Sequence, residues 1–211
     1  SFPTRRSSDL VEAVCFEAVD HVPLPSCSTR PERAALRLLT RLALPFVTLG
    51  GREAHAALTA LRASNTDVAF AGAVADSWVR VGLELERLAA DDVPDGAALR
   101  GIASSIGRMR VPATLRVFAA IWAARRERDV AAPTGAQVAR LARRMLRIAF
   151  RDPIALGDLA VSGDELRKIG VKPGPLMGRI LHDLLQRVLV DPAINTHDQL
   201  LAIAVQHVEE N

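Results

Sequence analysis

Apolar residues recur along most of this chain at intervals of three and four, the spacing that places them on one face of an α-helix. Leu141, Met145 and Ile148 show the pattern, and Ile102 and Ile106 repeat it. No segment alternates apolar and polar residues for long enough to predict a β-strand. Aromatic residues make up only 4% of the chain, which disfavours a β-sandwich. The sequence therefore predicts an all-α fold, a multi-helix array with a helix–turn–helix-like tail at its C-terminal end.

We expect the chain to divide into four segments. Residues 1–10 fit nothing that follows, and Ser7–Leu10 match the translation of a common sequencing adapter, so we exclude them as non-native sequence. Residues 11–30 are expected to form an irregular lead-in. Residues 31–150 are a predicted helical body region, and residues 151–211 are a predicted helical tail. On this interpretation the chain is a fragment whose true N-terminus is missing.

Helix-capping residues and prolines mark where individual helices should begin. Ser64 is placed to cap a long helix, and Thr134 to cap another that runs to about Phe150. Pro112 is well placed in the first turn of a helix, because its missing N–H would have no partner there.

Cysteine usage indicates a cytoplasmic protein, whereas the basic charge is only weak support for a nucleic-acid partner. Cys15 and Cys27 lack metal-site spacing, so we expect reduced, unpaired thiols. No apolar run approaches the length of about 18 residues that a membrane span needs. The chain has 27 basic residues, of which only Lys168 and Lys172 are lysines. Arginine suits bidentate phosphate contacts, although a GC-rich genome would produce the same bias.

The segment GDELRKIGVKPGPLMG, residues 163–178, predicts a tight corner between two helices. Ser162 and Glu165 have the spacing of a capping box that opens the first helix. Gly170 stands where a helix end requires positive φ, and Pro175 suits the first position of the second helix. The residues predicted to build this corner are Gly163, Gly170, Pro173, Pro175 and Gly178. We expect Gly178 to let a neighbouring backbone come close.

The run from Asp152 to Ala204 closely resembles the C-terminal part of the bacterial class II CCA-adding tRNA nucleotidyltransferases and their poly(A) polymerase relatives. With h for a hydrophobic residue, the family pattern is D-L-x-I/V-x-G-x-x-L, then G-h-x-P-G-P-x-h-G-x-h-L, then a P-x-x-N loop. Its residues in this chain are Asp158, Leu159, Gly163, Leu166, Gly170, Lys172, Pro173, Gly174, Pro175, Gly178, Leu181, Pro192 and Asn195. The resemblance implies a helical portion that binds tRNA during CCA addition or 3′-end processing.

The resemblance also implies that catalysis belongs to an N-terminal head of the same chain, which holds the catalytic carboxylates. The family's G-S-x-x-x-D-x-D motif does not occur in these 211 residues. We therefore assign no catalytic residue and expect no cofactor here, and the chain alone is expected to be inactive. Mg²⁺ with CTP and ATP is expected for the full-length parent. Because nucleotides are selected in the head, the product could be CCA, CC, A or poly(A).

Two sets of basic residues are candidates for contact with the RNA backbone. The first, here called the arginine stripe, consists of Arg140, Arg143, Arg144, Arg147 and Arg151. Helical spacing places it on one face, opposite Leu141 and Met145, with no acidic residue before Asp152. The second set is Lys172, Gly174 and Arg179, at the start of the helix that begins at Pro175. The alternatives are an ordinary solvated face and a corner that only packs two helices.

Two other functions remain open at this point. His182–Asp183 and His197–Asp198 raise the possibility of a degenerate HD-type phosphohydrolase. Adjacent residues of a helix point apart and rarely share a ligand sphere, so we assign no metal site. The remaining alternative is a stand-alone helical interaction module.

Overall fold

The computed structural model describes residues 30–47 and 49–209. The predictions for residues 1–10 and for the lead-in with Cys15 and Cys27 fall outside these ranges. No single helix in the described ranges is long and apolar enough to span a membrane, and only the bent pair Ala34–Phe46 and Gly51–Ala60, taken together, meets the length and composition required.

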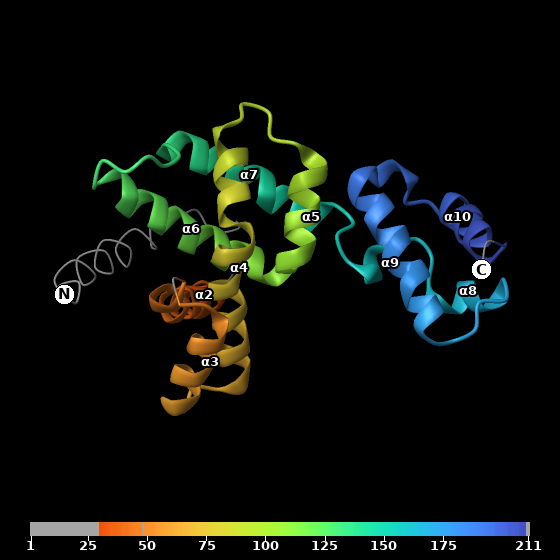
Figure 1. The fold of residues 1–211 in the computed structure, drawn as a ribbon, viewed down its shortest axis with the longest axis horizontal. Helices are drawn as coiled ribbons and strands as arrows, with labels where there is room; N and C mark the ends of the chain where they lie inside the picture. The colour runs from red at the N-terminus through yellow and green to blue at the C-terminus, as the bar shows by residue number, and fades with distance from the viewer. Residues whose placement is uncertain (1–29, 48, 210–211) are drawn as a thin grey trace, which may run out of the picture. The chain divides into compact units, whose positions relative to one another are not determined.

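Every regular element in the described residues is a helix, which confirms the predicted all-α fold. The α-helices are α2 (Arg30–Ala43), α3 (Gly51–Ala60), α4 (Asn65–Ala90), α5 (Gly96–Ile106), α6 (Val111–Arg126), α7 (Gly135–Arg151), α8 (Gly163–Lys168), α9 (Pro175–Val190) and α10 (His197–Glu209) (Figure 1). Short 3-10 helices occur at Leu44–Phe46, Arg108–Arg110, Leu156–Asp158 and Pro192–Ile194.

Local sequence accounts for where several helices begin. The Ser64 hydroxyl accepts a hydrogen bond from the Asp67 backbone N–H at 3.1 Å and caps α4. Thr134 and Gln137 exchange hydrogen bonds at the start of α7, where the Gln137 N–H donates to the Thr134 hydroxyl at 3.3 Å. Pro112 lies in the first turn of α6. The three predicted helix starts are therefore confirmed.

The chain groups into two compact units. Unit 1 comprises Ser1–Pro94 and Met109–Leu146, and unit 2 comprises Asp95–Arg108 and Arg147–Asn211. Helix α5 therefore belongs with the C-terminal helices, although it precedes α6 in the sequence. A boundary between the units falls within α7, which is one continuous helix.

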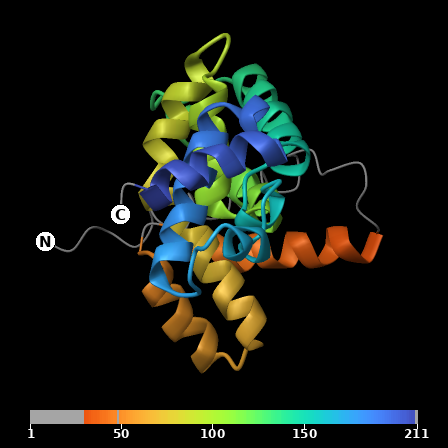
Figure 2. The same cartoon turned by 90° about the vertical axis from the view of Figure 1, so that its right-hand side faces the viewer.

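In unit 1, α3 and the first half of α4 run side by side (Figures 1 and 2). Their close approach depends on Gly51, because a Cβ there would lie 2.6 Å from the Gly72 carbonyl oxygen. The Trp122 ring is fully buried and packs against Phe118 with ring centroids 5.9 Å apart, and Phe118 packs against Trp78 at 4.9 Å. Both tryptophans of the chain thus lie in unit 1.

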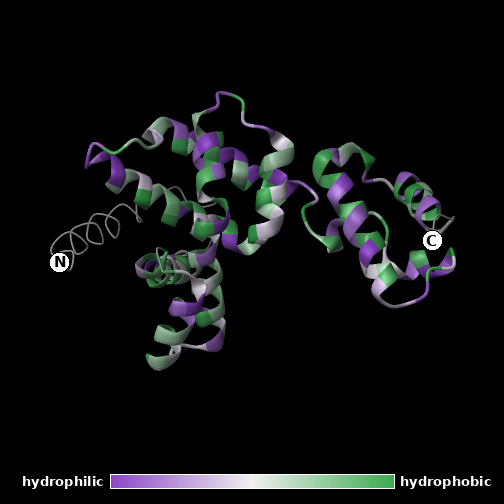
Figure 3. Cartoon of the chain, in the orientation of Figure 1, coloured by the Kyte–Doolittle hydropathy of each residue, from purple (hydrophilic) through white to green (hydrophobic). Residues whose placement is uncertain are grey.

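In unit 2, α8, α9 and α10 pack around one hydrophobic cluster. Figure 3 shows hydrophobic and hydrophilic residues alternating along α9, as expected for a helix with one buried face. The buried members of the cluster are Val161, Leu166, Val171, Ile180, Leu184, Val188, Leu200 and Ala204. Helix α5 packs against α9 in the same unit.

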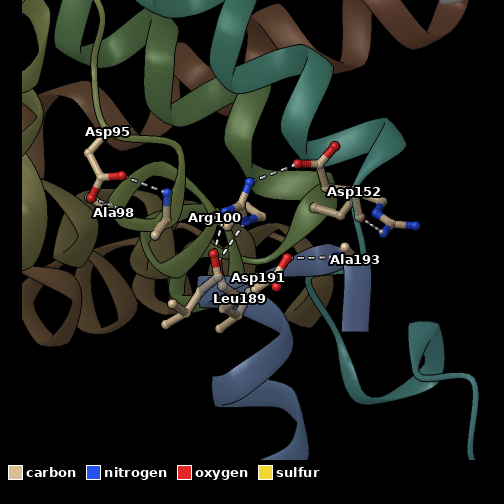
Figure 4. Close-up of polar contacts among 10 residues, drawn as sticks. Asp95, Ala98, Arg100, Asp152, Leu189, Asp191 and Ala193 are labelled. Carbon is tan, nitrogen blue, oxygen red and sulfur yellow. Dashed lines mark hydrogen bonds and ion pairs between the residues drawn. The ribbon is translucent and has the colours of Figure 1, made fainter. Parts of the chain in front are cut away.

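Arg100 of α5 binds the C-terminal end of α9 (Figure 4). Its guanidinium donates to the carbonyl oxygens of Leu189 at 2.7 Å and Val190 at 2.9 Å, and it lies 3.5 Å from a carboxylate oxygen of Asp152. The last carbonyls of a helix have no partner within the helix. Arg100 therefore caps α9 from a different helix, and no local pattern in the sequence connects the two.

The corner between α8 and α9 has most of the predicted geometry. Ser162 and Glu165 form the capping box of α8, and Pro175 begins α9. Gly170 has a φ of +96°, as its position at the end of α8 predicts, and Gly174 has a φ of +144°. Pro173 lies in the turn between the two helices.

The prediction for Gly178 is wrong. Among the described residues, nothing lies within 4 Å of the position that a Cβ on Gly178 would occupy, so no backbone of residues 30–47 or 49–209 comes close there. The reason is that Gly178 lies on the exposed side of α9, away from the buried residues Ile180 and Leu184. The tight contact is instead at Gly163, where a Cβ would lie 3.2 Å from the Met177 sulfur.

Gly170→Val should lower the free energy of unfolding by about 1 kcal/mol or more, because a β-branched residue is strained at positive φ. A side chain at Gly170 meets no atom within 4 Å, so backbone conformation alone would cause the loss. Gly157→Val is the matched control, since Gly157 also has open space but no positive φ. Thermal unfolding followed by circular dichroism measures both. Equal melting temperatures for the two variants would exclude a special role for Gly170.

Candidate nucleic-acid interface

Helix α7 carries the arginine stripe on the side opposite its core residues. Leu141 and Met145 are buried. Arg143, Arg147 and Arg151 are exposed, and hydrophobic and hydrophilic residues alternate along the helix (Figure 3). The predicted division of α7 into an apolar face and an arginine face is therefore confirmed.

Arg140 differs from the rest of the stripe because it has acidic partners. Its guanidinium lies 3.2 Å from the Asp92 carboxylate and donates to the Asp91 carbonyl oxygen at 3.0 Å. The lack of acidic residues along the stripe itself therefore does not leave Arg140 without a counter-charge. The reason is that the loop after α4 brings acidic residues against the start of α7, a proximity that helical spacing does not reveal. The charge of Arg140 is partly neutralised within unit 1.

The other four arginines of the stripe have no ion-pair partner in residues 30–47 and 49–209. They are Arg143, Arg144, Arg147 and Arg151, of which Arg144 is half-buried. The nearest acidic residue along the chain, Asp152, lies 3.5 Å from the Arg100 guanidinium. Like charges three and four residues apart on a helix destabilise it unless an anion is near. The stripe thus concentrates four unpaired guanidinium groups on about two turns of helix.

The corner in unit 2 presents a smaller basic surface. Lys172 and Arg179 are exposed, and neither has an ion-pair partner in the described part of the chain. Between them, Gly174 takes a backbone conformation that favours glycine, and Pro175 begins α9. The first N–H groups of a helix have no partner within it.

Asp158, a residue of the family pattern, organises the loop between α7 and α8. Its carboxylate accepts the backbone N–H groups of Ile154 and Ala155, both at 2.9 Å. The same carboxylate oxygen accepts a hydrogen bond from the Arg108 guanidinium at 2.7 Å. Asp158 therefore joins this loop to the segment that follows α5, all within unit 2.

Asn195, in the P-x-x-N loop, connects two parts of the family pattern. Its side-chain oxygen accepts the Ala160 N–H at 2.9 Å, and its side-chain nitrogen donates to the Asp158 carbonyl oxygen at 2.9 Å. The loop before α8 and the loop after α9 are thereby joined by one amide. Asp158 and Asn195 thus hold the loops of the tail together, while Gly170, Gly174 and Pro175 shape the corner.

The comparison with known families agrees with this arrangement. Residues 118–204 match the family described as tRNA nucleotidyltransferase domain 2. The match confirms the resemblance of Asp152–Ala204 and extends it upstream over α7, so the whole arginine stripe and the corner lie inside it. Neither the curated proteins nor the solved structures gave a match to the chain.

Within the matched range 118–204, the first His-Asp dipeptide contributes to helix contacts. The Asp183 carboxylate accepts hydrogen bonds from Arg187 at 2.8 Å and from the His207 ring at 2.7 Å, which joins α10 to α9. Burial acts to raise the pKa of Asp183, but these hydrogen bonds and charges outweigh it and the pKa is lowered. His182 lies beside Gln186 on the exposed side of α9.

The second dipeptide lies at the start of α10. His197 is 3.0 Å from a Glu165 carboxylate oxygen and 3.2 Å from Asp198. The pKa of His197 is raised by its hydrogen bond to Asp198 and by the charge of Glu165. The pKa of Glu165 is lowered, first by hydrogen bonds from Ser162 and then by His197. Both dipeptides therefore contact neighbouring helices, which does not favour the HD-type hydrolase alternative.

Proposed function

We propose that this chain binds tRNA by its phosphate backbone through the arginine stripe. The observation that carries the proposal is the set of four unpaired arginines on one side of α7, inside the range that matches tRNA nucleotidyltransferase domain 2. A domain of that description implies interaction with tRNA in general. Each planar guanidinium can donate two parallel hydrogen bonds to a phosphate group.

Such an interface would bind without reading the nucleotide sequence. Phosphate contacts fix the position and register of a nucleic acid, whereas sequence is read at the base edges. All tRNAs share one backbone chemistry and differ in sequence, so a phosphate-binding surface suits a protein that must accept many of them. We propose Lys172, Gly174 and Arg179 as a second and smaller contact in unit 2.

We also propose that this tRNA binding serves the addition of nucleotides to the tRNA 3′ end. The chain would act with a nucleotidyltransferase head that adds nucleotides to the tRNA 3′ end in the cytoplasm, with Mg²⁺, CTP and ATP bound by that head. In residues 30–47 and 49–209, no group of His, Cys, Asp or Glu side chains is placed to hold a metal ion. The described residues do not fit a Mg²⁺ site, so we derive no step of that reaction from this chain.

A salt titration of tRNA binding tests the proposal. We expect log K to fall linearly with log salt concentration, with a slope of about −3 to −4 if four phosphates are neutralised. Two tRNAs of unrelated sequence should give the same slope and affinity. Fluorescence anisotropy of end-labelled tRNA measures both quantities. Absence of binding at low salt would instead favour the stand-alone interaction module.

A further inference from the structure

Arg140 belongs to the arginine stripe, but its guanidinium is held by the loop that follows α4. Its terminal nitrogens take separate partners. Nη2 donates to the Asp91 carbonyl oxygen at 3.0 Å, and Nη1 lies 3.2 Å from the Asp92 carboxylate. Helical spacing places Arg140 on the same side of α7 as Arg143 and Arg144, which follow it by three and four residues. The loop therefore occupies a guanidinium that would otherwise face the same ligand as its neighbours.

The two contacts of Arg140 differ in what they contribute to the fold. Asp91 is the C-cap residue of α4, so the bond to its carbonyl oxygen satisfies an acceptor that a helix end leaves open. The Asp92 side chain is 96% exposed, and an ion pair in such a position adds little stability. Acidic side chains just beyond a helix C-terminus are also disfavoured by the helix dipole. The carbonyl bond thus anchors Arg140, whereas the fold gains little from the charge of Asp92.

We infer that Asp92 competes with the RNA backbone for Arg140 and thereby lowers the affinity of the arginine stripe for tRNA. A phosphate that binds Arg140 must displace the Asp92 carboxylate. The displaced carboxylate stays well within the Debye length of about 8 Å from that phosphate and repels it. Affinity differences at one interface arise mainly from dissociation rates, so the competition should speed the release of tRNA. The inference rests on the proposed function and adds how the strength of binding is set.

The other carboxylates of this loop have different partners. Asp95 accepts backbone N–H groups at the start of α5 and caps that helix. The Asp91 carboxylate lies 3.9 Å from the Arg87 guanidinium, one turn earlier in α4. Asp92 is the loop carboxylate that contacts the stripe. A substitution of Asp92 therefore tests the competition without removing a helix cap.

Asp92→Asn tests the inference because it keeps the shape of the side chain and removes its charge. The dissociation constant for tRNA should fall about threefold, or about 0.7 kcal/mol, the size expected of an exposed ion pair that opposes binding. The slope of log K against log salt should become steeper by up to about one, because Arg140 then neutralises a further phosphate. Fluorescence anisotropy of end-labelled tRNA measures both quantities. The melting temperature should not change, because Asp92 is exposed.

Glu84→Gln is the matched control, because it removes one negative charge from an exposed position of α4 in the same unit. A double-mutant cycle then adds Arg140→Ala to the wild type and to Asp92→Asn. Arg140→Ala should weaken binding about threefold more in the Asp92→Asn background than in the wild type. If Asp92→Asn strengthened binding equally with and without Arg140, or no more than Glu84→Gln does, Asp92 would act by general repulsion and the inference would be wrong.

The outcomes also separate this inference from the proposed function. If Asp92→Asn binds tRNA only as tightly as the wild type while variants of the arginine stripe lose affinity, the competition does not exist and the proposed function stands. If the wild type does not bind tRNA at low salt, the proposed function fails and this inference fails with it.

Discussion

Asp158→Ala should lower the free energy of unfolding of unit 2 by about 3 kcal/mol. The substitution leaves the backbone N–H groups of Ile154 and Ala155 and the Arg108 guanidinium without the acceptor that they share. Leaving a partly buried donor without its acceptor lowers the free energy of unfolding by about 1–3 kcal/mol. Here three donors lose the acceptor that they share. Water can reach part of this site, because the Asp158 side chain is 24% exposed, so we expect less than the full sum.

Chemical denaturation can measure this loss in unit 2 separately from unit 1. Far-UV circular dichroism follows the helices of both units, whereas tryptophan fluorescence reports only unit 1, which contains Trp78 and Trp122. The circular dichroism transition should move to lower denaturant concentration while the fluorescence transition stays in place.

The matched control is Asp164→Ala. Asp164 forms an exposed ion pair with Arg167 within α8, and removing it should change stability by no more than about 0.5 kcal/mol. If Asp158→Ala cost no more than this control, water would be replacing the carboxylate, and Asp158 would not organise the loop.

The parts of this fold that could be predicted from sequence depend on neighbours within one helix or one turn. Ser64 and Thr134 cap their helices because the N–H group each one binds lies three residues ahead. Gly170 and Pro175 take their predicted conformations for the same local reason. A pattern of three to five residues contains all the information that such features need.

Contacts between distant segments could not be predicted in this way. Arg100 caps α9, and Arg140 binds Asp92. In both pairs the residues lie too far apart in the sequence for helical spacing or a turn motif to connect them. The family pattern singled out Asp158 and Asn195, but their hydrogen bonds became evident only when the loops of unit 2 were seen together. Helical spacing identifies the exposed face of α7 and not the acidic residues that reach it.

Gly178 shows that a glycine within a helix does not by itself identify a close neighbour. A glycine in a helix suggests that another group packs closely against the helix at that position. From the sequence we expect this group to be a neighbouring backbone of the same chain. The structure shows open space instead.

The substitution expected to change binding most is the triple variant Arg143→Ala/Arg144→Ala/Arg147→Ala. Removing one arginine that binds a phosphate should reduce the salt slope by up to about one, so removing three should reduce it by up to about three. At low salt the affinity for tRNA should fall at least about tenfold, or about 1.4 kcal/mol. Lys172→Ala removes one charge and should have a smaller effect on both quantities.

The variant should remain folded, because alanine is a strong helix former and the change removes like charges three and four residues apart. The matched control is Arg52→Ala/Arg62→Ala/Arg80→Ala, which removes the same charge from exposed positions of α3, α4 and the turn between them. We expect the control to lose far less affinity, because a local phosphate contact depends on where the charge stands. Equal losses in the two triple variants would mean that net charge alone attracts tRNA, and the arginine stripe would then be an ordinary solvated face.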